Sequence, residues 1–218
     1  MVNMLTIFLN TCLQICSNVT TLLFFAPELL KIHPMEKNNI QIACSLLKNG
    51  GIVAYPTESV WGLGCDPFNE SAVQRILDLK KRSLDKGLIL VAGEFEQLEE
   101  LIAPLSEQFL DRLRNSWPGP TTWLIPDPLN CFPNWIKGQH SSVAIRISAH
   151  PIVSTLCRRF GRPVVSTSAN SSGEQEIKSK SELKRQFGVN IDYIVNGKLG
   201  GNDSASTIKD LTTNKVLR

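Results

Sequence analysis

Several common catalytic motifs are absent from this sequence of 218 residues. It has no GxxxxGKS/T phosphate-binding loop and no GxGxxG fingerprint, so a P-loop enzyme is excluded and Rossmann-type binding has no signal. There is no GxSxG motif, and the chain has 3 histidines, so a Ser-His-Asp hydrolase is poorly supported. His150 directly precedes Pro151, and we expect it to cap the helix that starts there.

Metal-binding cysteine patterns are absent as well. The 6 cysteines include no CxxC pair, and no histidine-rich spacing accompanies them. A zinc site or a disulfide framework is therefore not expected, and reduced cysteines in a cytosolic protein are the better interpretation. Cys65 lies close to one of the loops described below, where we expect a small packed side chain rather than a nucleophile.

Charge of either sign is modest. The net charge is +3, with 20% charged and 42% hydrophobic residues, which is ordinary for a globular protein. This balance permits an RNA or nucleotide partner without arguing for one. The length predicts one domain with a substantial core.

The first 34 residues lack charge almost entirely, because no charged residue precedes Glu28. A signal peptide needs early basic residues and a small-residue cleavage site, and a membrane span needs about 20 mostly apolar residues. Neither pattern is met. We expect residues 1–34 to be an over-called start or a disordered extension, and residues 35–218 to be the folded domain, beginning at Met35.

Helix and strand patterns alternate through residues 35–218. Helices are predicted by apolar periodicity and by caps at Asn69, Pro151 and Ser179, whereas short β-branched runs predict strands. The expected helices are 39–48, about 70–80, 95–101, 106–115, 151–160 and 180–187. The expected strands are 52–55, 88–91, 121–125, 143–147, 164–165, 191–195 and 215–217. This mixture predicts an α/β domain built on a mixed sheet.

Two hydroxyl-rich segments follow expected strands about 110 residues apart. They are Tyr55–Gly64 (YPTESVWGLG) and Val165–Gly173 (VSTSANSSG). Backbone N–H groups and hydroxyls in such loops can surround a phosphate or a carboxylate. With the cationic stretch KKRSLDK between them, these segments predict a site for an anionic small molecule, most simply a nucleotide.

Lys80 and Arg82 stand at the end of an expected helix. For an arbitrary helix, such cations usually complement the helix dipole or are simply solvated. Here they lead into a loop beside a buried strand, where arginine offers bidentate geometry and lysine a mobile charge for phosphates. We therefore expect both side chains to be solvent-accessible cations of the site.

Arg146 lies inside an apolar strand, so it needs a partner. The sequence leaves two possibilities open: a bound anion, or an internal ion pair with Glu58. Ser166, Ser168 and Asn170 alternate along one extended segment and are able to share a face. Their alternative is a local turn in which these side chains satisfy their own backbone.

Taken together and in order, these segments resemble the YrdC family in its short bacterial form. The matching elements are Tyr55–Gly64, Leu79–Arg82, Asp85–Leu90, Trp117–Thr122, Val143–Arg146, Ser166–Gly173, Ser206–Asp210 and the terminal Val-Leu-Arg. The resemblance covers about residues 35–218. The sequence differs from the family at Ser83, where proline is frequent. We expect serine to leave the loop looser, and no catalytic group is lost.

The resemblance implies a twisted mixed β-sheet flanked by helices around a large, positively charged cavity. It also implies a nucleotidyltransferase that converts L-threonine, bicarbonate or CO2, and ATP with Mg2+ into threonylcarbamoyl-adenylate and pyrophosphate. A partner complex would then transfer the threonylcarbamoyl group to an adenosine beside the anticodon of tRNA, in the cytoplasm and without a membrane.

The family's site residues carry over by position. Lys80 and Arg82 would bind the ATP phosphates, and Thr57 with Arg146 would bind threonine. Thr122, Ser166, Ser168 and Asn170 would contact nucleotide phosphates, carbamate or Mg2+. Ser206 or Thr207 would close over the adenylate. The residues expected to be catalytic are Lys80, Arg82, Ser168 and Asn170, and no direct protein ligand of a metal is assigned.

Two other functions remain open at this stage. A non-catalytic RNA-binding module would use the same basic cavity, although aromatic residues make up only 7% of the chain and form no stacking pattern. A domain that handles carbamoyl-adenylate would usually belong to a longer chain with zinc-finger cysteines.

Overall fold

The computed structural model describes residues 34–218. The chain divides into two units, residues 1–37 and 38–218, and all the strands lie in the second. The expectation for the apolar extension falls on residues 1–33, which lie outside the described residues. Within the described part, no helix is both long and apolar enough to cross a membrane.

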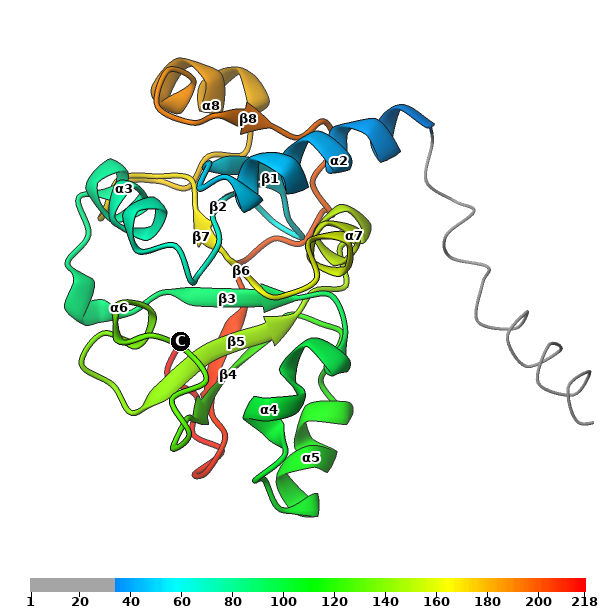
Figure 1. The fold of residues 1–218 in the computed structure, drawn as a ribbon, viewed down its shortest axis with the longest axis vertical. Helices are drawn as coiled ribbons and strands as arrows, with labels where there is room; N and C mark the ends of the chain where they lie inside the picture. The colour runs from blue at the N-terminus through cyan, green and yellow to red at the C-terminus, as the bar shows by residue number, and fades with distance from the viewer. Residues whose placement is uncertain (1–33) are drawn as a thin grey trace, which may run out of the picture. The chain divides into compact units, whose positions relative to one another are not determined.

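The strands of the described part form two mixed sheets (Figure 1). The first has the order β7-β2-β1-β8, with β1 Val53–Pro56, β2 Trp61–Gly64, β7 Thr167–Ser168 and β8 Tyr193–Ile194. The second has the order β6-β3-β5-β4-β9, with β3 Ile89–Ala92, β4 Thr121–Pro126, β5 Ser142–Ile147, β6 Val164–Val165 and β9 Thr207–Asp210. Parallel pairing joins β1 to β8, β3 to β5 and β4 to β9, and the other pairs are antiparallel.

Helices begin and end where the sequence provides caps. Asn69 accepts a hydrogen bond from the backbone N–H of Ala72, and Ser179 accepts one from Glu182. Gly161 ends its helix with a left-handed backbone at φ 89°. The helical elements are α2 Pro34–Lys48, α3 Glu70–Lys80, η2 Leu84–Lys86, η3 Phe95–Leu98, α4 Glu99–Ile102, α5 Glu107–Arg114, α6 Asn134–Lys137, α7 Pro151–Phe160 and α8 Lys180–Phe187.

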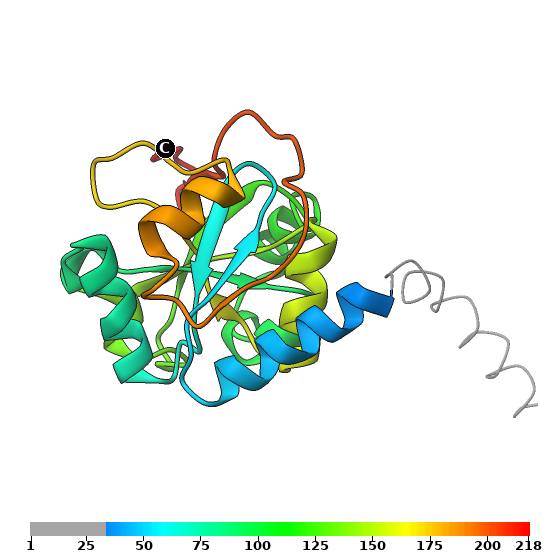
Figure 2. The same ribbon diagram turned by 90° about the horizontal axis from the view of Figure 1, so that it is seen from above.

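Helix α7 contacts both sheets, because it packs against β1 and β3. Its buried residues Val153, Leu156 and Phe160 share a hydrophobic cluster with Leu47 of α2 and Tyr55 of β1. Helices α2 and α7 accordingly lie side by side in both ribbon views (Figures 1 and 2). A second cluster joins the apolar side chains of β2 through β5 with α3 and α8. The two sheets are therefore held in one packed domain.

The predicted α/β class and mixed pairing are confirmed, and most predicted elements appear within two residues of their expected bounds. The strands are divided between two sheets, however, and three short strands were not predicted: β2, β7 and β9. The strand expected at 215–217 is reduced to an isolated bridge between Val216 and Lys209. The His150 ring makes no capping hydrogen bond; its Nε2 lies 3.0 Å from the Lys198 carbonyl oxygen instead.

Candidate functional site

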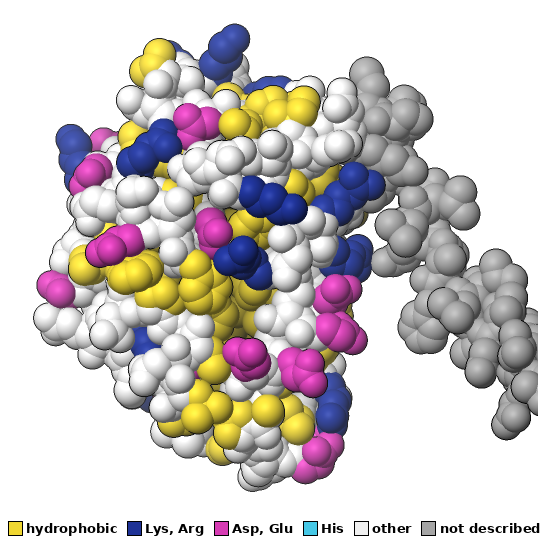
Figure 3. Space-filling view, viewed as in Figure 1, with side chains coloured by type: hydrophobic (Ala, Val, Ile, Leu, Met, Phe, Trp, Pro, Cys, Tyr) yellow, Lys and Arg dark blue, Asp and Glu magenta, His cyan; other side chains and the backbone are white. Residues whose placement is uncertain are grey.

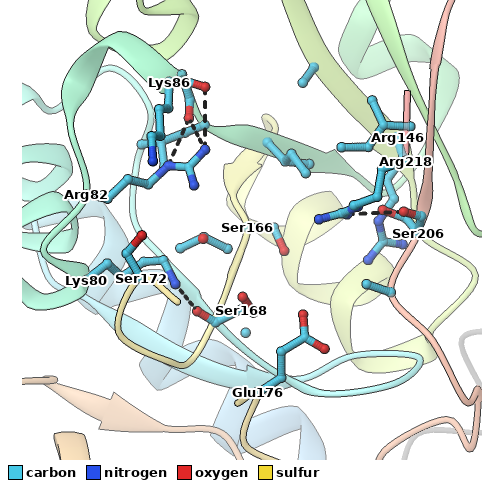
Figure 4. A pocket seen from close by; sticks show the side chains of 18 of the residues that line it. Lys80, Arg82, Lys86, Arg146, Ser166, Ser168, Ser172, Glu176, Ser206 and Arg218 are labelled. Atoms are coloured by element: carbon cyan, nitrogen blue, oxygen red, sulfur yellow. Dashed lines mark hydrogen bonds between the residues drawn. The ribbon is translucent and has the colours of Figure 1, made fainter. Parts of the chain in front are cut away.

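A cavity of about 480 Å³ brings together segments from both sheets. Its walls come from the β1–β2 turn, the end of α3 with the loop that follows, the start of β3, one face of β5, and residues 166–176 and 205–218. Figure 4 shows several of these side chains converging on one space. The structure therefore places the two hydroxyl-rich segments and the cationic stretch around one cavity. Ten residues were predicted for the site, counting Thr207 as the alternative to Ser206. Thr122 and Thr207 do not line the cavity, and the other eight do: Thr57, Lys80, Arg82, Arg146, Ser166, Ser168, Asn170 and Ser206.

Lys80, the last residue of α3, points its ammonium group at the segment after β7. Its Nζ donates to the carbonyl oxygens of Ser168 at 2.5 Å and Asn170 at 2.8 Å, and to Asn170 Oδ1 at 3.2 Å. These three acceptors use all three N–H groups of the ammonium. Lys80 is only 3% exposed, so the expectation of a solvent-accessible cation was wrong for this residue. It is buried because its partners, 88 and 90 residues away, fold over the helix end.

Burial also shapes the charge of Lys80. Desolvation lowers the pKa of its ammonium to about 8, repulsion from Arg82 acts in the same direction, and Glu176 opposes both. With its pKa at about 8, the side chain is still mostly protonated at pH 7 and keeps its N–H donors. It ties the end of α3 to the Ser168–Asn170 segment, and the residue also lines the cavity.

Arg82 follows α3 after a tight reversal. Lys81 adopts the left-handed conformation, with φ 49°, and so ends the helix. The Arg82 guanidinium donates to the Gly87 carbonyl oxygen from Nε at 3.3 Å and from Nη2 at 2.9 Å. Burial, and after it repulsion from Arg218, lower the pKa of Arg82. The two guanidinium groups are thus near enough to repel each other, and an anion between them would relieve that repulsion.

The segment from Ser166 to Asn170 presents hydroxyl and amide groups to the cavity. Ser168 Oγ donates to Asn170 Oδ1 at 2.6 Å, and Asn170 Nδ2 donates to the Glu174 carbonyl oxygen at 2.7 Å. Both sequence interpretations hold in part: the three side chains face one cavity, and two of them also hydrogen-bond locally. The segment is held in place through Ser168, which pairs with Gly62 across β7 and β2.

Arg146 forms an internal ion pair with Glu58. Nη1 and Nη2 donate to the two carboxylate oxygens at 2.7 and 2.9 Å, and Glu58 Oε1 also accepts from Ser148 Oγ at 2.6 Å. Burial alone would raise the pKa of Glu58, but the hydrogen bonds and charge of Arg146 lower it to about 2. Glu58 accepts hydrogen bonds from Nη1 and Nη2 of Arg146 but not from Nε. Arg146 also lines the cavity.

Two predicted threonines have different positions. Thr57 lies in the β1–β2 turn and lines the cavity, with its hydroxyl donating to the Val60 carbonyl oxygen at 2.7 Å. Thr122 is fully buried in β4 and does not line the cavity. Its Oγ1 lies 2.9 Å from Ser206 Oγ, so it positions Ser206 rather than facing a ligand. Ser206 also holds the terminal arginine, since Arg218 Nη2 donates to its carbonyl oxygen at 3.1 Å.

Comparison with known proteins identifies this arrangement. Residues 45–218 match the model of the Sua5/YciO/YrdC family, which carries the description "Telomere recombination". The chain belongs to the Sua5/YciO/YrdC family. The relative from Coxiella burnetii RSA 493 is 47% identical over 180 residues, covering 83% of this chain and 96% of the relative. One from Pseudomonas aeruginosa is 47% identical over 178 residues, covering 82% and 95%. Both relatives are named threonylcarbamoyl-AMP synthase.

Solved structures of the Sua5/YciO/YrdC family share the fold. The crystal structure of P. abyssi Sua5 complexed with L-threonine aligns with a TM-score of 0.74 at 36% identity, covering 79% of this chain. This chain spans about half (51%) of that protein. E. coli YciO aligns with a TM-score of 0.73 over 85% of this chain, and at 23% identity it supports the fold alone.

Sequence reasoning missed four charged residues that line the cavity in this family member: Lys86, Lys137, Glu176 and Arg218. Lys137 is already paired with Asp127 at 3.1 Å. Lys86 and Arg218 stand inside motifs that carried the family resemblance, so they were visible but received no role. Glu176 lies in an irregular segment with no pattern to mark it. The described residues contain no group of three or more His, Cys, Asp or Glu side chains arranged to hold a metal.

Proposed function

We propose that this chain is a threonylcarbamoyl-AMP synthase, which makes threonylcarbamoyl-adenylate and pyrophosphate from L-threonine, bicarbonate or CO2, and ATP. The observation that carries the proposal is the convergence of Lys80, Arg82, Ser168 and Asn170 on one cavity. Relatives of that name, about 47% identical over nearly their whole length, support it.

The reaction makes demands that this cavity is able to meet. The threonine ammonium first loses a proton to solvent, and the neutral amine then captures carbon dioxide and releases a second proton as the carbamate forms. One carbamate oxygen attacks the α-phosphorus of ATP. A P–O bond forms to the carbamate as the bond to pyrophosphate breaks, and pyrophosphate carries the leaving electron pair. Little acid–base chemistry is needed, so catalysis rests on holding several anions in line and stabilising charge on phosphorus. The cavity is lined mainly by cationic and hydroxyl side chains, with His140 as its one histidine among the described residues, and this composition suits the task.

The phosphates of ATP would lie among the cationic side chains. The cavity is lined by Lys80, Arg82, Lys86 and Arg218, which supports the expected positive charge. Arg82 is half-buried, and its guanidinium is near enough to that of Arg218 for the two to repel each other. A phosphate between them would be held from two sides. Lys80 donates its N–H groups to the Ser168–Asn170 segment. It would therefore act by keeping that segment in position to contact the phosphates. Ser206, positioned by Thr122, would close over the adenylate.

L-Threonine would bind beside Arg146 and Thr57. The Nε side of Arg146 remains available for a carboxylate while its outer N–H groups hold Glu58. The complex of P. abyssi Sua5 with L-threonine supports a threonine site in this fold. Glu58 would thus fix the direction in which Arg146 meets the substrate.

Mg2+ would enter with ATP. This ion prefers oxygen donors, keeps several waters and often binds through substrate phosphates, and the hydroxyl of Ser166 lines the cavity where it could hold it. When bound, it would neutralise charge on the phosphates. The oxygen-rich wall fits such an ion.

The adenylate would serve tRNA modification. A cytoplasmic partner complex would transfer the threonylcarbamoyl group to an adenosine beside the anticodon in tRNAs that read codons starting with A. The alternative of a non-catalytic RNA-binding module gains no support from the comparisons. On the face shown in Figure 3, basic side chains are interspersed with acidic ones rather than gathered into a continuous stripe.

The test is pyrophosphate release by the full chain with ATP and Mg2+, with threonine and bicarbonate each present or omitted. We expect release only when both are present, and none from Arg82→Ala. Arg75→Ala is the matched control, because Arg75 lies on α3 outside the cavity, in an exposed ion pair with Asp192. Release without threonine, or equal activity in Arg82→Ala, would contradict the proposal.

A further inference from the structure

Glu176 is the one carboxylate among the described residues that line the cavity. Its neighbours hold it in place: the Asn170 amide donates to the Glu174 carbonyl oxygen at 2.7 Å, and the Trp61 N–H donates to the Ile177 carbonyl oxygen at 3.0 Å. Ile177 itself is buried in the core at 1% exposure. The residue is therefore fixed on both sides, although it belongs to no helix or strand.

The carboxylate of Glu176 has no hydrogen bond or ion pair within residues 38–218. It is half-buried, and in Figure 4 it points into the cavity in the gap between Ser168 and Ser206. Its attraction raises the pKa of Lys80, so the two charges interact. Lys80, however, already gives its three N–H groups to other oxygens. A carboxylate in this position keeps its acceptor sites open for a ligand.

We propose that Glu176 binds the α-ammonium group of L-threonine, an inference that rests on the proposed function. A carboxylate repels bicarbonate, carbamate and the phosphates of ATP. It accepts hydrogen bonds from neutral hydroxyls and amino groups, but its strongest pairing is with a cation. Threonine carries an ammonium group a few bonds from its carboxylate. Arg146 lines the same cavity as Glu176, and Glu58 does not use its Nε N–H. A carboxylate and a guanidinium lining one cavity match the two charges of an amino acid.

The rival cation is Mg2+, and the geometry favours the ammonium. Mg2+ would accompany the phosphates, and the phosphate-facing groups Arg82 and Lys86 lie well apart from Glu176 in Figure 4. Glu176 is also the only acidic side chain on the cavity wall of the described chain, so a metal ion there would take its other ligands from water and phosphate, whereas an ammonium group needs no further acidic partner. Once carbamate has formed, the nitrogen is neutral and its attraction to Glu176 ends, so the residue favours substrate over intermediate.

The test is calorimetric binding of L-threonine to the full chain in EDTA, without ATP. We expect Glu176→Gln to raise the Kd about tenfold, as loss of one charge-assisted contact predicts. Glu174→Gln is the matched control, because its exposed side chain lies in the same segment and makes no hydrogen bond or ion pair within the described residues. The second ligand is 2,3-dihydroxybutanoate, which has a hydroxyl in place of the ammonium group, and it should bind wild type and Glu176→Gln alike.

Each outcome decides between the possibilities. Unchanged threonine binding in Glu176→Gln would overturn the inference. A parallel titration of ATP with Mg2+ and without threonine tests the rival ion: a loss in Glu176→Gln confined to that titration would assign the carboxylate to the metal instead. An equal loss for threonine and for 2,3-dihydroxybutanoate would show a distorted cavity and also overturn it. If the wild-type chain binds no threonine at all, the proposed function fails and the inference falls with it.

Discussion

Replacing Glu58 with glutamine removes the carboxylate that Arg146 holds through two hydrogen bonds. The pKa of Glu58 falls from its ordinary 4.5 to about 2 in the folded protein. Each pKa unit corresponds to about 1.4 kcal/mol, so the charged carboxylate contributes about 3 kcal/mol to the free energy of unfolding at neutral pH. The side chain is 14% exposed, which leaves little solvent to screen the pair.

The sign of the pH dependence follows from the depressed pKa. Unfolded chains take up the proton near pH 4.5, whereas the folded protein resists it until about pH 2. The stabilisation is therefore complete above about pH 5 and is lost as the pH falls from 4.5 through 2. About 2 kcal/mol of it should be gone at pH 3.

Urea unfolding of wild type and Glu58→Gln at pH 7 and pH 3 measures this loss. The other carboxylates titrate in both proteins, so the difference between the two isolates Glu58. We expect the advantage of wild type to shrink by about 2 kcal/mol between pH 7 and pH 3, and Glu174→Gln to track wild type throughout. An advantage of the same size at both pH values would refute the ion pair as the source of the stability.

Three further predictions follow from contacts in and beside the cavity. Arg82→Ala should lower pyrophosphate release at least about 100-fold while shifting the melting temperature little, because its partners are loop carbonyls; normal turnover would contradict this. Lys80→Met should lose both activity and roughly 1–3 kcal/mol of stability, because the buried Asn170 carbonyl oxygen loses its donor; an unchanged urea midpoint would contradict this. Gly64→Ala should destabilise the domain by roughly 1–3 kcal/mol, because the added Cβ would meet the Val165 carbonyl oxygen at 2.5 Å; thermal unfolding measures it, and wild-type stability would contradict it.

Local signals were sufficient to predict most of the helices and the longer strands. Asn69 and Ser179 cap their helices through short-range hydrogen bonds, which a sequence window contains in full. The short strands differ in kind. Trp61–Gly64 contains two glycines and has no β-branched run, and it becomes a strand through pairing with β1 and with Ser168, more than 100 residues away.

The same distinction applies to the site. The segments that form the cavity were predictable because their composition is unusual at each position along the chain. The burial of Lys80 was not, since it depends on carbonyl groups from a distant loop. For Arg146 the sequence left an anion and Glu58 as alternatives, and the structure shows the ion pair while keeping Arg146 at the cavity wall. Long-range packing, which no local pattern records, decides such cases.

The most direct test of the proposed synthase activity is mass spectrometry of the product formed from 13C-bicarbonate, L-threonine, ATP and Mg2+. The account predicts threonylcarbamoyl-adenylate carrying the 13C label with wild type and Arg75→Ala, and none with Arg82→Ala. ATP consumption without the labelled adenylate, or no turnover together with tight RNA binding, would contradict it.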